Sequence, residues 1–140
     1  MLRLIALASI GLLAIFPASA ELYLTGPHLN YVLHCQGCHL ADGSETPGGV
    51  PALAGSVGRF LAVPGGRKYL ARVPGARNAP VGDVELAALL NWMIDRFGGS
   101  ETPEGWVRYT PEEVTQLRGL PMGDIAETRA GLVRASGAPH

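Results

Sequence analysis

Two cysteines and a histidine stand within five residues, at Cys35, Cys38 and His39, and the chain has no other cysteine. Two cysteines are too few for a disulfide-rich scaffold. A structural zinc site needs four ligands, and the other three histidines do not stand at zinc-finger spacing. A redox dithiol of the thioredoxin type would follow a strand, whereas the residues before Cys35 have helical spacing. A disulfide between the two cysteines is possible, but it would not explain the adjoining histidine.

The same five residues suit the covalent attachment of a haem. Two thiols can add across the two vinyl groups of a porphyrin as thioethers, and the histidine that follows can bind the iron. The pattern therefore predicts one haem c, with Cys35 and Cys38 binding the cofactor and His39 as its metal ligand. Aromatic residues make up only 6% of the chain, so a macrocycle would supply much of the apolar bulk of a small core.

The first twenty residues, 1–20, predict a secretory signal peptide. Arg3 precedes the apolar run Leu4–Phe16, and small residues lead up to Ala20, where we expect cleavage. As a helix this run would reach only about 20 Å, which is short of the roughly 30 Å hydrocarbon core of a membrane. We therefore expect an exported, periplasmic protein with no stable membrane insertion after cleavage.

The apolar spacing of the remaining chain predicts an all-α fold. Leu29, Val32 and Leu33 share one face of a helix that leads into Cys35. The longest predicted helix is Val84–Phe97, with Asp83 as its N-cap. Glycine and proline predict a loop over residues 40–56 and a connector over 98–109. The other predicted helices are short ones at 57–63 and 67–73, and two capped by Thr110 and Asp124.

With these elements the chain resembles the monohaem c-type cytochromes of the class I bacterial type, over about residues 26–97. Residues 49–55 are similar to the glycine-rich loop of that family, which implies that the Pro51 carbonyl accepts a hydrogen bond from His39 and that Leu53 lies against the haem. Residues 83–92 are similar to the family's last helix. The resemblance implies a haem-binding domain over residues 21–98, wrapped around one covalent haem, and a two-helix extension over 99–140 outside the family pattern.

The expected sixth iron ligand is missing from its usual place. The family takes a methionine from the loop before its last helix, but residues 73–82 hold no Met, His or Lys. Met122, in a loop beside a proline, Asn78, at about the usual position, and Met93, on the last family helix, are candidates, and an open site is the alternative. Four cations could pair with the haem propionates: Arg59, Arg67, Lys68 and Arg72.

Three functions remain. The resemblance implies a non-enzymatic electron carrier between a periplasmic dehydrogenase and a downstream acceptor. An open iron site would instead suit a ligand-binding or catalytic haem protein, peroxidase-like or gas-binding. An extension anchored through Trp106 and Tyr109 would suit a fixed subunit of a dehydrogenase complex. The net charge of −1 provides no strong steering field and excludes a polybasic nucleic-acid binder.

Overall fold

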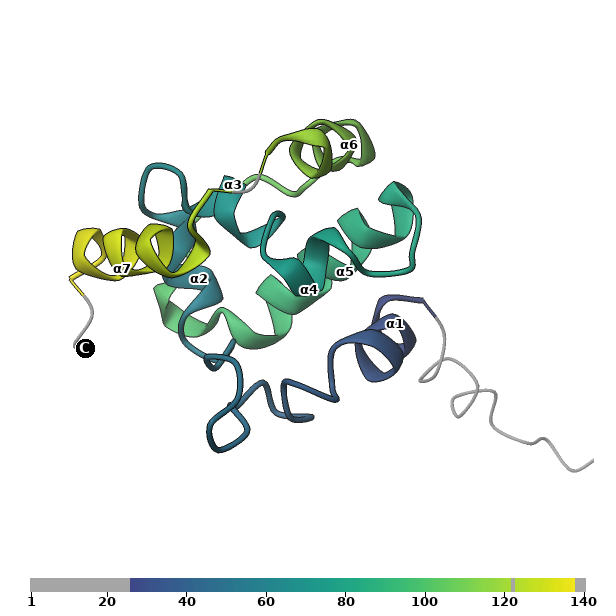
Figure 1. Cartoon of the computed structure of the whole chain (residues 1–140), viewed down its shortest axis with the longest axis horizontal. Helices are drawn as coiled ribbons and strands as arrows, with labels where there is room; N and C mark the ends of the chain where they lie inside the picture. Colours follow the sequence, from purple (N-terminus) through teal and green to yellow (C-terminus); the bar gives the residue numbers. More distant parts are fainter. Residues whose placement is uncertain (1–25, 122, 138–140) are drawn as a thin grey trace, which may run out of the picture.

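The computed structural model describes residues 26–121 and 123–137, and these residues form helices and loops without a β-strand (Figure 1). The predicted all-α class is therefore confirmed. The predicted signal peptide lies outside the described residues. No helix in the described part of the chain is long and apolar enough to cross a membrane. The helices are α1 Pro27–His34, α2 Val57–Leu61, α3 Gly66–Leu70, α4 Pro74–Arg77, α5 Asp83–Phe97, α6 Pro111–Gly119 and α7 Ile125–Ala135, with a 3₁₀ turn, η2, at Gly99–Glu101.

Helix α1 packs across α5 through a single buried tyrosine. The Tyr31 ring lies 5.3 Å from that of Trp92 and 5.2 Å from that of Phe97, measured between centroids. Its hydroxyl donates a 2.6 Å hydrogen bond to the Leu40 carbonyl. Burial raises the pKa of Tyr31 to about 12, so the hydroxyl keeps its proton. These contacts fix the end of α1, and with it Cys35, against the long helix α5.

The start of α5 differs from the prediction. The N-cap is Gly82, whose backbone N–H donates to the Glu85 carboxylate at 2.7 Å. The predicted cap, Asp83, is wrong, because its carboxylate accepts hydrogen bonds from Thr115 at 2.6 Å and from Arg118 at 2.8 Å. Both partners belong to α6. Asp83, which was expected to cap the start of α5, therefore links α5 to the C-terminal extension instead.

The short helices lie where the glycines and prolines predicted them, and the structure adds one further helix, α4. Helices α2 and α3 form where expected, but each covers only five residues. The predicted loop over 73–82 contains the one-turn helix α4, which begins at Pro74, a residue that suits a first helical turn. Helix α2 meets the end of α5 at two glycines. A Cβ atom on Gly58 would lie 2.5 Å from the Gly98 carbonyl oxygen, so only glycine permits this approach.

The C-terminal extension folds back onto the rest of the chain around Tyr109. This side chain is buried, and its hydroxyl donates to the Arg67 carbonyl at 2.6 Å. Its backbone exchanges two hydrogen bonds with the Asn91 side chain, at 2.8 and 3.0 Å. The Arg67 guanidinium lies 4.0 Å from the centre of the Tyr109 ring and donates two 2.6 Å bonds to Glu113. Tyr109 is thus an anchor within this chain, and its burial disfavours the predicted role as an anchor for a partner.

Replacing Arg67 by alanine should lower the free energy of unfolding by about 2 kcal/mol. The change removes two hydrogen bonds to the Glu113 carboxylate, a third to the Val107 carbonyl and a cation–π contact, all at a half-buried position. Arg108→Ala is the matched control, because the Arg108–Asp95 pair is largely exposed and should contribute less than about 1 kcal/mol. Denaturant unfolding of the loaded protein, followed by circular dichroism, measures both. Equal losses in the two variants would contradict this account of the extension.

Candidate haem site

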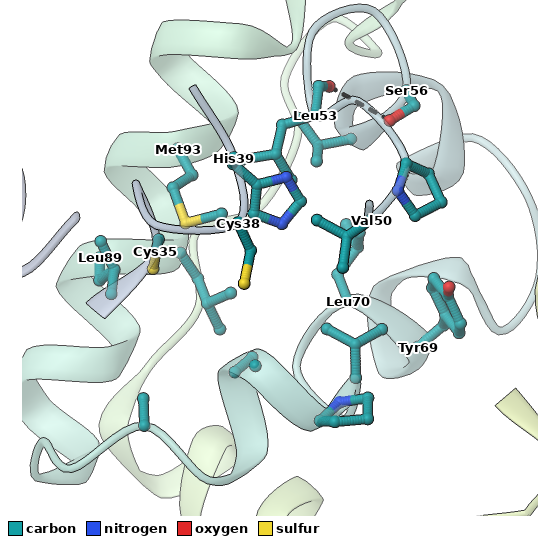
Figure 2. Close-up of a pocket in the computed structure, with 18 of the residues that line it drawn as sticks. Cys35, Cys38, His39, Val50, Leu53, Ser56, Tyr69, Leu70, Leu89 and Met93 are labelled. Carbon is teal, nitrogen blue, oxygen red and sulfur yellow. Dashed lines mark hydrogen bonds between the residues drawn. The ribbon is translucent and has the colours of Figure 1, made fainter. Parts of the chain in front are cut away.

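A pocket of about 520 Å³ opens between the segment that follows α1 and the helices α3, α4 and α5 (Figure 2). This volume lies in the range of pockets that take a small molecule or cofactor. Cys35, Cys38 and His39 all line it, so the structure brings together the three residues singled out from the sequence. The remaining lining is mostly apolar and includes Leu53, Val57, Phe60, Leu70, Leu86, Leu89, Leu90 and Ile94.

A tight turn after α1 places the cysteines and the histidine. The Cys35 N–H still donates to the Tyr31 carbonyl, as in a helix, at 2.9 Å. The Cys35 carbonyl then accepts from the backbone N–H of Cys38 at 3.0 Å and of His39 at 2.9 Å. The labelled side chains of Figure 2 show both sulfurs and the imidazole beside the same cavity. The local chain path therefore presents two thiols and one imidazole to one ligand.

Burial keeps the Cys35 thiol and the His39 imidazole uncharged. It raises the pKa of the Cys35 thiol to about 11, with a smaller contribution from the neighbouring Cys38. It lowers the pKa of His39, so the imidazole is neutral at pH 7. Neutral imidazole is the form that binds a metal, and a thioether sulfur carries no charge. The surroundings suit both predicted roles.

The Nδ1 atom of His39 is buried and has no hydrogen-bond partner among the described residues. The expected hydrogen bond from His39 to the Pro51 carbonyl is therefore absent, although Pro51 does line the pocket. Buried polar atoms are rarely left unpaired in a folded protein. A histidine that binds a metal uses one ring nitrogen for the metal and the other for a hydrogen bond, so the unpaired Nδ1 does not by itself identify a ligand. The fit rests on the donor set: two thiols and one neutral imidazole face a cavity with apolar walls, and these residues fit a covalently attached haem.

The candidates for the sixth ligand lie in different places. Met93 lines the pocket, and Figure 2 shows its side chain directed toward His39. Asn78 is exposed and is absent from the pocket wall. Met122 lies outside the described residues. His34 lines the pocket next to Cys35, and His28 stacks on Trp92 at 5.2 Å.

The four cations considered as possible partners of the haem propionates do not line the pocket: Arg59, Arg67, Lys68 and Arg72. Arg59 forms an ion pair with Glu101 at 3.5 Å, and Arg67 forms one with Glu113 at 2.6 Å. Two residues that the sequence analysis did not single out, Ile125 and Arg129, do line it. Both lie on α7, one helical turn apart. That spacing, in a helix capped by Asp124, was the only signal in the sequence, and it does not reveal which surface the helix covers.

Comparison with known proteins identifies the family. No family model matches the chain. Two proteins named cytochrome c-552, both from Thermus thermophilus and the second from a named strain of that species, are each 35% identical to it over 102 residues. The matches cover 60% of this chain and 78% and 69% of the two relatives. The chain belongs to the monohaem c-type cytochromes.

Membership of this family confirms the predicted resemblance and the cofactor. A cytochrome of this family carries one covalently bound haem c with its iron. At the family level this cytochrome is a haem c electron-transfer protein. The helical structure agrees with the class I fold. The individual roles of Cys35, Cys38 and His39 stay predictions, which the geometry of the pocket supports.

Proposed function

We propose that this cytochrome is an exported, non-enzymatic electron carrier, which accepts single electrons from a periplasmic dehydrogenase and passes them to a downstream acceptor. The observation that carries the proposal is the convergence of Cys35, Cys38 and His39 on one apolar pocket. Cys35 and Cys38 hold the haem as thioethers, and His39 binds the iron. Haem iron, when bound, supplies a one-electron couple whose potential the axial ligands and the surrounding polarity set.

The chain's own residues support outer-sphere transfer. The apolar walls exclude water from the pocket, which reduces the solvent rearrangement that accompanies a change of charge. At the rim, Val50 is 36% exposed, and Pro51 and Cys38 also reach the surface. A partner can therefore approach this edge over a small apolar contact, as is usual for short-lived redox encounters. Because the net charge of the chain is small, electrostatic attraction steers such an encounter only weakly.

Redox titration combined with rim variants tests the carrier function. The loaded protein should show one reversible couple with a one-electron slope. Val50→Asp should slow reduction by a flavoprotein or quinoprotein dehydrogenase of the same cell at least threefold, because it buries a charge in the contact. Val107→Asp is the matched control, since Val107 is also exposed and does not line the pocket. Equal rates in the two variants would contradict an approach over this rim.

One observation favours the alternative of a ligand-binding haem protein. The segment before α5 lines the pocket with Val73, Pro74, Gly75 and Ala76. None of these side chains can bind iron, so this segment supplies no sixth ligand. A carrier should be low-spin in the ferric state and bind carbon monoxide slowly or not at all in the ferrous state. A high-spin ferric spectrum with immediate binding of carbon monoxide would support the alternative. The same spectra of Met122→Leu test whether that methionine supplies the sixth ligand.

A further inference from the structure

Helix α7, the last helix of the extension, forms part of the haem pocket. Asp124 caps it by accepting a 2.8 Å hydrogen bond from the Glu127 N–H. Leu132 is buried, and α7 packs against α3. This placement turns Ile125 and Arg129 toward the cavity, although both lie outside residues 26–97, over which the sequence analysis found the resemblance.

Arg129 differs from the other cations of the described residues. It is the one arginine or lysine among them that lines the pocket, and its guanidinium has no hydrogen-bond acceptor or carboxylate partner there. Arg118, by contrast, donates to Asp83 and to three backbone carbonyls. No described aspartate or glutamate lines the pocket. A half-buried guanidinium beside an apolar cavity therefore lacks an anion.

We propose that Arg129 binds a propionate carboxylate of the haem. The inference rests on the proposed function, because it requires a haem in this pocket. Two propionates are the only anionic groups of the macrocycle, and a guanidinium donates to a carboxylate through two parallel N–H groups. The titratable neighbour on α3 is Tyr69, and burial raises the pKa of its hydroxyl, so it does not compete as an anion. The extension thereby becomes a positioning element for the cofactor.

Arg129→Gln in the loaded protein tests the proposal. Loss of a nearby positive charge favours the ferric state, so the equilibrium between ferrous and ferric forms should shift three- to tenfold toward ferric; tenfold corresponds to about 59 mV for one electron. The propionate bending band in resonance Raman spectra should shift as well. Arg129→Lys should restore most of the potential. Arg134→Gln, an exposed arginine of the same helix that does not line the pocket, is the matched control and should change neither quantity.

A further variant separates charge from packing. Leu132→Ala loosens α7 but keeps the cation, so it should lower the unfolding temperature and leave the propionate band of the folded protein unchanged. An Arg129→Gln protein with an unaltered potential and propionate band would overturn the proposal. So would a variant in which only the affinity of ferric iron for cyanide changes, since Arg129 would then face the iron. Absence of covalent haem from the wild-type protein would instead overturn the proposed function.

Discussion

Replacing both Cys35 and Cys38 by serine should abolish covalent haem completely. Each thiol supplies one thioether, and the chain holds no other cysteine. The mature protein should then have the mass of the bare polypeptide, and acidified acetone should extract any haem. Each single variant is a control, because one thioether remains and should resist extraction. A double variant whose mass still includes haem would contradict the assigned roles of the two cysteines.

The same double variant should also fail to fold stably. The pocket measures about 520 Å³ and its walls are mostly apolar, so without haem these walls would face water. At about 1.5–3 kcal/mol for each large apolar side chain left exposed, a few of them would offset the roughly 5–15 kcal/mol of stability of an ordinary domain. We therefore expect the walls to collapse or unfold when nothing occupies the pocket. Circular dichroism of the double variant should show a large loss of helix, whereas the single variants keep theirs.

Truncation after Gly98 should have the largest effect on stability of any change considered for the loaded protein. Among its described residues, the deleted segment contributes three buried side chains: Tyr109, Val114 and Leu132. At about 1.5–3 kcal/mol for each, their loss amounts to roughly 5–9 kcal/mol, before the newly exposed surfaces of α3 and α5 are considered. Thermal unfolding of the loaded protein measures the effect.

The control for this truncation is a shorter one, after Gly137, which leaves every described helix in place. Its unfolding temperature should equal that of the full chain. If truncation after Gly98 left the unfolding temperature unchanged, the extension would not be part of the core. Because the long truncation weakens the whole fold, loss of a partner from that variant would not show that the extension binds the partner.

What the sequence predicted correctly depends on short-range interactions. Thr110 and Asp124 cap helices because each accepts a hydrogen bond from the backbone three residues later. The turn through Cys35 is equally local. Asp83 failed as a predicted cap because its partners, Thr115 and Arg118, lie more than thirty residues further along the chain.

The open choices at the pocket depend on contacts of the same long range. Arg67 was one of four cations that could pair with a propionate, and its partner Glu113 is 46 residues away. The pairing of Arg67 with α6 and the seating of Arg129 at the pocket both depend on how the extension folds back, which periodicity within one helix does not encode. The boundary at residue 98, the roles of the site residues and the redox partners stay predictions.

The position of Arg129 late in the chain makes the cofactor site depend on segments from both ends of the described residues. Cys35, Cys38 and His39 follow α1, whereas Ile125 and Arg129 belong to α7, the last helix described. The wall of the pocket is therefore complete only once α7 has docked, so a substitution that misplaces this helix would also alter the surroundings of the haem.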